Sequence, residues 1–144
     1  FLKDGTIEEN IAFGIPSNEV CQTRLKSAIK LAQLSNFIDS HKDGCHTIVG
    51  EGGSKLSGGQ RQRIGIARAL YKGVEVLIFD EATSALDSNT EKKVMSAIGG
   101  LDKNITIIMI AHRLSTLKNC TRIIKLEGGG ISIINNSNNL NPII

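Results

Sequence analysis

Aromatic residues are scarce in this chain of 144 residues, at 3% of the total with no tryptophan. Few side chains can therefore stack on nucleic-acid bases. The charge balance is mild as well, with 17 Lys and Arg against 14 Asp and Glu, and no basic run stands out. We therefore expect no nucleic acid among the partners.

Long apolar runs and paired cysteines are missing too. The longest apolar runs lie at 76–79 and 105–111, and both are far too short to cross a bilayer. The three cysteines are scattered and form no C-x-x-C pair, which favours a reducing cytosol. His41, Cys45 and His46 lie close together, but a fourth ligand at zinc-like spacing is missing, so we expect no metal there.

The chain up to about residue 55 predicts a small, mostly helical region. A capping box formed by Thr6 and Glu9 predicts a short helix that ends before Gly14. Apolar residues on one broad face predict a second helix over 18–33, and a third, short helix follows. The glycine-rich residues 47–53 are expected to be exposed.

The stretch Leu56-Ser57-Gly58-Gly59-Gln60 is the feature around which the rest of the chain is organised. Two adjacent glycines let the backbone approach a ligand closely, and Ser57 adds a hydroxyl. A helix predicted over 60–71, ended by Lys72 and Gly73, points the positive end of its dipole back at the glycines. The stretch therefore predicts an anion site, with phosphate as the expected ligand. The alternative is an ordinary glycine turn before an amphipathic helix.

Three arginines of this helix, Arg61, Arg63 and Arg68, admit two interpretations. They could bind phosphate, or they could form a solvated face of the helix. The second arrangement is the commoner one for charged residues on a helix, and it is the one that we expect.

Acidic residues follow a short apolar run at 76–79, which predicts a strand buried on both faces. Carboxylates at the carboxyl end of such a strand lie where α/β folds bind ligands. Asp80 can hold Mg²⁺, which takes oxygen ligands, and Glu81 suits a general base for an attacking water. The alternative is a surface Asp-Glu pair after a core strand.

A second capping box, formed by Ser88 and Glu91, predicts a helix to about Ile98. Residues 105–110 predict another buried strand, and His112 follows it as a titratable group well placed near a phosphate.

The end of the chain predicts two strands and a tail. The strands are expected over 121–126 and 131–134, joined by a glycine turn. The Asn-rich residues 135–141 are low in complexity and are expected to be mobile.

Five of these features, in this order, closely resemble the nucleotide-binding domain of ATP-binding cassette (ABC) transporters. The resemblance assigns Leu56–Gln60 to the signature motif, 76–80 to the Walker B strand, Glu81 to the catalytic glutamate, 84–87 to the D-loop and His112 to the switch histidine. Three further stretches, 6–11, 47–53 and 111–116, look like those of exporters. The resemblance covers residues 1 to about 134.

The resemblance implies an α/β fold, a partial P-loop NTPase core with parallel strands plus a small helical subdomain. It divides the chain into a helical subdomain at 1–73, a core part at 74–134 and a flexible tail at 135–144. It places the chain at the cytoplasmic face of a membrane, as the ATPase of an exporter whose transmembrane domain is a partner.

The resemblance also implies a split site, because two such domains pair head to tail with ATP between them. Asp87 of the D-loop and the signature residues Leu56, Ser57, Gly58, Gly59 and Gln60 would serve the ATP held by the partner domain. Asp80 would position Mg²⁺, Glu81 would polarise water and His112 would steady the γ-phosphate.

The departure from the family pattern is that no G-x-x-x-x-G-K-S/T is present among the 144 residues. This phosphate-cradling motif and the Q-loop are expected upstream, and we expect this piece alone to be a poor or inactive ATPase. Two alternatives stay open. One is a DNA-repair or chromosome-type ABC ATPase, and the other is a non-catalytic truncated fragment that binds a partner domain.

Overall fold

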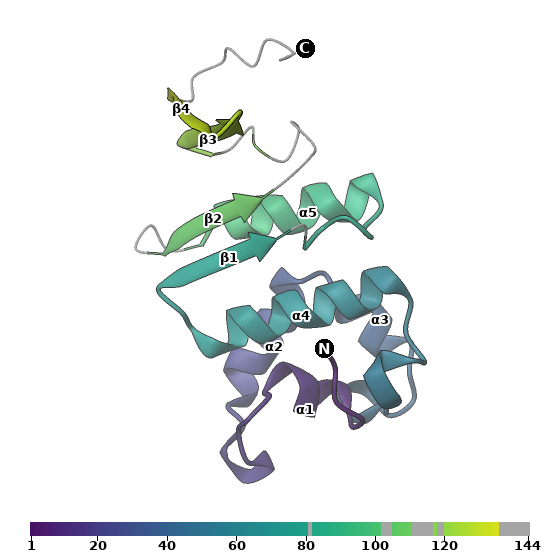
Figure 1. Ribbon diagram of the computed structural model, residues 1–144. Helices are drawn as coiled ribbons and strands as arrows, with labels where there is room; N and C mark the ends of the chain where they lie inside the picture. Colours follow the sequence, from purple (N-terminus) through teal and green to yellow (C-terminus); the bar gives the residue numbers. More distant parts are fainter. Residues whose placement is uncertain (81, 102–104, 111–116, 118–119, 136–144) are drawn as a thin grey trace.

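A computed structural model describes residues 1–80, 82–101, 105–110, 117 and 120–135 of the protein (Figure 1). The α-helices are α1 (Ile7–Ile11), α2 (Gln22–Leu31), α3 (Ser35–Asp39), α4 (Gly58–Lys72) and α5 (Ser88–Gly99), and the strands are β1 (Val76–Asp80), β2 (Thr106–Ile110), β3 (Arg122–Glu127) and β4 (Gly130–Asn135). Short 3₁₀ turns lie at Ser17–Glu19, Gly44–His46 and Glu51–Gly53. The predicted α/β class with parallel strands is confirmed, since β1 and β2 pair in parallel.

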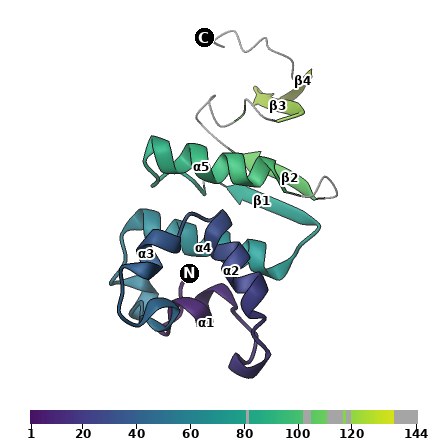
Figure 2. The same ribbon diagram turned by 180° about the vertical axis from the view of Figure 1, so that it is seen from behind.

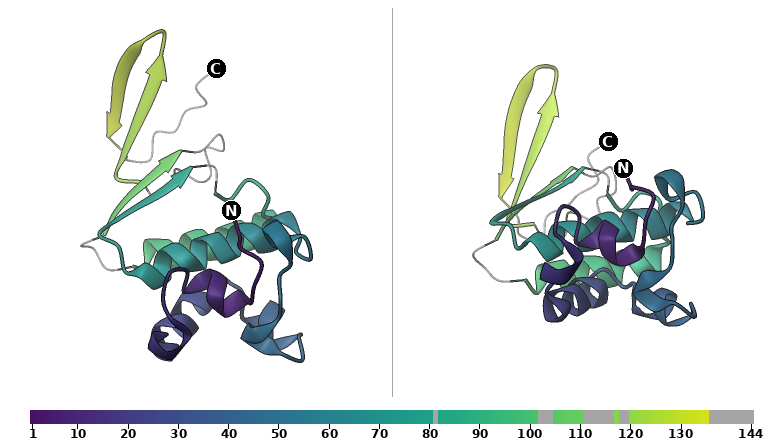
Figure 3. Two further views of the ribbon diagram at one scale, coloured as in Figure 1. Left: turned by 60° about the horizontal axis from the view of Figure 1, so that its bottom comes forward. Right: turned by 90° about the horizontal axis from the view of Figure 1, so that it is seen from below.

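The helical part is built around α4, which lies between the shorter helices and β1 (Figures 1 and 3). The capping box of α1 forms as predicted, with the Glu9 N–H donating to Thr6 Oγ1 at 3.1 Å. The second helix starts later than predicted, at Gln22. Its preceding residue Cys21 is extended, and the Cys21 N–H donates instead to the Tyr71 hydroxyl at 3.0 Å.

Residues 47–53 are only partly exposed, contrary to expectation. Val49 is fully buried and its N–H donates to the Gly5 carbonyl at 2.9 Å. The Ile7 N–H donates to the Thr47 carbonyl at 3.0 Å, so this loop pairs with residues 5–7 at the start of α1. The prediction failed because the loop contains backbone groups that bond to a segment about 40 residues earlier.

Of the three arginines of α4, Arg61 is exposed, as a solvated face predicts, whereas Arg63 and Arg68 are partly buried. Arg68 donates to the Asn10 and Phe1 carbonyls at 2.7 and 2.9 Å, and Arg63 donates to the Gln33 carbonyl at 2.6 Å. Burial lowers the pKa of Arg63 and of Arg68. Arg63 and Arg68 therefore join α4 to distant segments, whereas Arg61 donates to the Leu56 carbonyl at 2.7 Å, just before the helix.

The parallel pair β1–β2 has α5 on one face (Figures 1 and 2). Leu77 and Phe79 of β1 are buried, but Val76 and Ile78 are 51% and 62% exposed. The prediction of a strand buried on both faces is therefore wrong for the part of the chain that the structure describes. Buried residues from Leu2 to Ile98 nevertheless form one continuous core through the helices and β1.

The predicted hairpin near the end of the chain is confirmed as β3 and β4, which pair antiparallel from Arg122↔Asn135 to Glu127↔Gly130. Gly128 and Gly129 form its turn with φ values of +56° and +79°, which glycine adopts without strain.

Candidate functional site

The glycine stretch forms the first turn of α4, so this helix begins at Gly58, two residues earlier than predicted. Ser57 is its N-cap: Ser57 Oγ accepts from the Gln60 N–H at 3.2 Å, and Gln60 Oε1 accepts from the Ser57 N–H at 2.7 Å. This S-x-x-Q capping box is visible in the sequence but was not recognised there. Because the first N–H groups of a helix have no partner within it, the turn can bind an anion.

The two glycines face the loop 84–87. A Cβ atom at Gly59 would lie 3.1 Å from the Ala85 carbonyl oxygen, and one at Gly58 would lie 3.4 Å from the Ala85 Cβ. The side chain of Leu86, which is buried, lies beside Gly59 as well. At Gly59 this close approach leaves little room for a Cβ, whereas the contact at Gly58 has an ordinary van der Waals length.

Two side chains hold the loop 84–87 and its approach. Gln62 of α4 donates from Nε2 to Ser84 Oγ at 3.0 Å and accepts from the Ala85 N–H at 3.0 Å. Thr83 donates to Glu91 of α5 at 3.1 Å. Gln62 has no signal in the sequence that points to this role, since only the fold brings α4 beside this loop.

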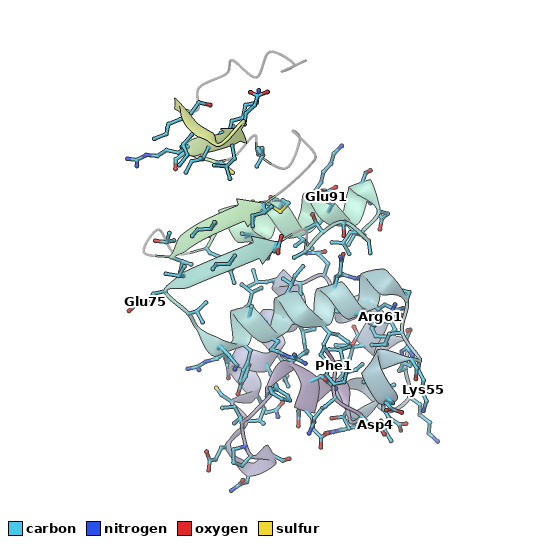
Figure 4. The ribbon with its side chains drawn as sticks, viewed as in Figure 1. Phe1, Asp4, Lys55, Arg61, Glu75 and Glu91 are labelled. Atoms are coloured by element: carbon cyan, nitrogen blue, oxygen red, sulfur yellow. The ribbon has the colours of Figure 1, made fainter. Side chains whose placement is uncertain are left out.

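The helix α5 is capped by Asp87 and not by Ser88, which corrects the predicted Ser88–Glu91 capping box. The Asp87 carboxylate accepts from the N–H groups of Asn89 and Thr90 at 3.1 and 3.0 Å. Hydrogen bonds from Thr90 are the main reason that the pKa of Asp87 is lowered. Glu91 is instead buried on α5 (Figure 4), where it accepts from the Thr83 hydroxyl.

The predicted catalytic groups are only partly described. Asp80 is exposed at the carboxyl end of β1, opposite Ile110 at the end of β2. Glu81 and His112 lie outside the described residues, so their predicted roles stay predictions. Within the described ranges, no group of three or more His, Cys, Asp or Glu is placed to hold a metal ion.

Residues 1–84, more than half of the chain, match the family model described as "ABC transporter". The chain belongs to this family. It is 52% identical over 130 residues to an "ATP-dependent lipid A-core flippase" of Francisella novicida and 48% identical over 131 residues to one of Ralstonia nicotianae, covering 90% of this chain and 22% of each relative. Among solved structures, "Structure of a bacterial Atm1-family ABC exporter with ATP bound" matches at 42% identity and a TM-score of 0.82, over 89% of this chain and 22% of that one.

Family membership confirms the resemblance and identifies the α/β elements as part of an ABC ATPase fold. It also implies an ATP-binding domain. The chain spans about a fifth of the length of the curated relatives that it matches. Among the described residues, no helix has both the length and the apolarity that crossing a membrane requires.

Proposed function

We propose that this chain is part of the ATPase domain of an exporter, and that the domain hydrolyses ATP to power transport across a membrane. The observation that carries the proposal is the contact between the capped glycine turn at 57–60 and the loop 84–87. The likeness to relatives named as exporters and flippases supports it.

In the proposed site, Ser57 and the first-turn N–H groups of Gly58 and Gly59 bind the γ-phosphate of ATP. The capping box fits this role, because a hydroxyl that accepts from the Gln60 N–H can still donate its own proton. Leu56 is buried and anchors the turn, and Asp87 fixes the loop at the start of α5. The P-loop of the partner domain holds the phosphate chain of the same ATP molecule.

The carboxyl end of β1 is the proposed catalytic edge. Asp80 fits a Mg²⁺ ion, since its carboxylate is exposed there and oxygen is the donor that this ion prefers. The ion would neutralise phosphate charge. Glu81 acts as the general base toward water, and His112 holds the γ-phosphate from the segment after β2.

The proposed assembly contains two ATPase domains, head to tail, and a transmembrane domain that places them at the cytoplasmic face. We also propose the division of the chain at residues 73 and 134. Lipid A-core is the first transport substrate to test, since it is named for the flippase relatives. The DNA-repair-type alternative is disfavoured by these relatives.

The test uses the full-length protein that carries these residues, purified and placed in lipid vesicles. Glu81→Gln keeps the side-chain shape but removes the base, so ATP hydrolysis should fall at least about a hundredfold while ATP binding persists. Gln22→Ala on the exposed face of α2 is the control. Hydrolysis that survives Glu81→Gln would contradict the assigned base. A wild-type protein that binds a partner domain but never hydrolyses ATP would favour the non-catalytic alternative.

A further inference from the structure

The Gln62 side chain of α4 takes part neither in the helix cap nor in the proposed phosphate binding. The Gln62 amide makes two hydrogen bonds to a loop 22 and 23 residues further along the chain. We propose that Gln62 is a positioning residue, which clamps the loop 84–87 to the first turns of α4 so that both meet the nucleotide as one body. This inference rests on the proposed function.

Both ends of the amide are used. Its NH₂ group donates to Ser84 Oγ at 3.0 Å, and its oxygen accepts from the Ala85 N–H at 3.0 Å. A methionine has a similar length and suits a helix, but it has no N–H to donate and its sulfur accepts only weakly. The pair of bonds therefore explains why a glutamine stands on this face of α4.

The clamp lies one turn beyond the glycines. Residues three and four apart share a helix face, so Gln62 lies on the same side of α4 as Gly58 and Gly59. There the Ala85 carbonyl oxygen already approaches within 3.1 Å of the place that a Cβ of Gly59 would occupy. Close packing at the glycines and hydrogen bonds at Gln62 thus hold one loop at two levels of the helix.

The remainder of the loop is tied to α5. Thr83 bonds to Glu91, and Asp87 caps the helix through the Asn89 and Thr90 N–H groups. Gln62 therefore links α4, which starts at the phosphate-binding turn, to a loop whose end and approach are tied to α5. Loss of this link should let the loop 84–87 and the turn at 57–60 move separately.

The experiment measures ATP hydrolysis by the full-length protein with Gln62→Met, Ser84→Ala and the double variant. Two lost hydrogen bonds predict a fall in kcat of about tenfold for Gln62→Met, with a smaller change in the KM for ATP. Ser84→Ala should lower kcat less, and the double variant should be no slower than Gln62→Met alone. The control is Gln22→Ala, which removes an exposed glutamine that bonds to Glu8.

A second readout follows the Ala85 amide by hydrogen exchange. Exchange at this N–H should quicken in Gln62→Met and stay at the wild-type rate in Gln22→Ala. A wild-type kcat in Gln62→Met, strictly additive effects in the double variant, or unchanged exchange at Ala85 would each overturn the inference. If the wild-type protein does not hydrolyse ATP, the proposed function fails, and the exchange rate alone decides whether the clamp exists.

Discussion

The helical part, residues 1–73, and the parallel strand pair β1–β2 differ in how their side chains are packed and hydrogen-bonded. In the helical part, even the fully buried Asn10 has partners: it donates to the Lys3 and Thr6 carbonyls and accepts from the Lys3 N–H and from Arg68. In the strand pair, by contrast, one face is packed and the other leaves apolar side chains exposed. The buried polar network of Asn10 is therefore complete within the helical part, whereas the sheet presents an apolar face suited to further packing.

Neighbouring residues of β1 test that contrast most strongly. Leu77 is 4% exposed and Ile78 is 62% exposed. Leu77→Ala should lower the free energy of unfolding of this chain by about 3 kcal/mol, because it leaves a cavity in the core. Ile78→Thr, which keeps a β-branched side chain, should change it by less than about 0.5 kcal/mol. Urea unfolding measures both, and equal losses would show that the exposed face is covered.

The same face predicts self-association of the 144-residue chain. Val76, Ile78, Ile108 and Ile110 are all about half exposed or more, and apolar edges and faces favour pairing. Sedimentation should show association that rises with concentration and weakens in Ile78→Thr. A wild-type chain that stays monomeric at high concentration would contradict this expectation.

The Asn10 network offers the next largest effect, now in the helical part. Asn10→Ala should cost about 3 kcal/mol of unfolding free energy, because it leaves several buried backbone and arginine groups without their partner. Asn36→Ala, on the exposed surface of α3, is the matched control and should cost less than about 0.5 kcal/mol. A small loss of unfolding free energy in Asn10→Ala would mean that water replaces the side chain, and the Asn10 site would then be accessible to solvent.

Two glycine substitutions in α4 test the contact with the loop 84–87, because Gly59 lies at this contact and Gly65 does not. Gly59→Ala should destabilise the protein by about 1 kcal/mol, since its Cβ would press on the Ala85 carbonyl. At Gly65 a Cβ meets nothing within 4 Å, so Gly65→Ala should stabilise the helix by about 0.5–1 kcal/mol. Thermal unfolding compares the two variants. A change in melting temperature of the same sign for both would contradict the assigned contact.

Local signals in the sequence predicted much of this fold. The Thr6–Glu9 capping box, the αL glycine at Gly73 and the glycine turn of the hairpin all depend on near neighbours, and each is confirmed. The misses depend on distant partners. Nothing near Arg68 or Gln62 reveals the Asn10 carbonyl or the loop 84–87, because the fold alone brings those groups together.

The cap of α5 shows a different limit, because Asp87 and Ser88 are adjacent and both suit an N-cap. Only the geometry selects Asp87, whose carboxylate accepts from Asn89 and Thr90. Asp80 stands where the sequence predicted, at the end of a strand. The roles of Glu81 and His112 stay predictions that activity measurements must test.

The smallest expected effect is the pH dependence at Asp87, which joins the strand part to its covering helix. Hydrogen bonds from Thr90 hold its pKa below the ordinary value of 3.8, so its ionised form stabilises the folded chain. That contribution is complete above the unfolded-state pKa and is lost as the pH falls through the lower, folded-state pKa. Asp87→Asn keeps an acceptor for the cap but removes the titration. Its melting temperature should therefore fall less steeply than that of the wild type below about pH 4, and parallel curves would show that the ionisation of Asp87 contributes nothing measurable to stability.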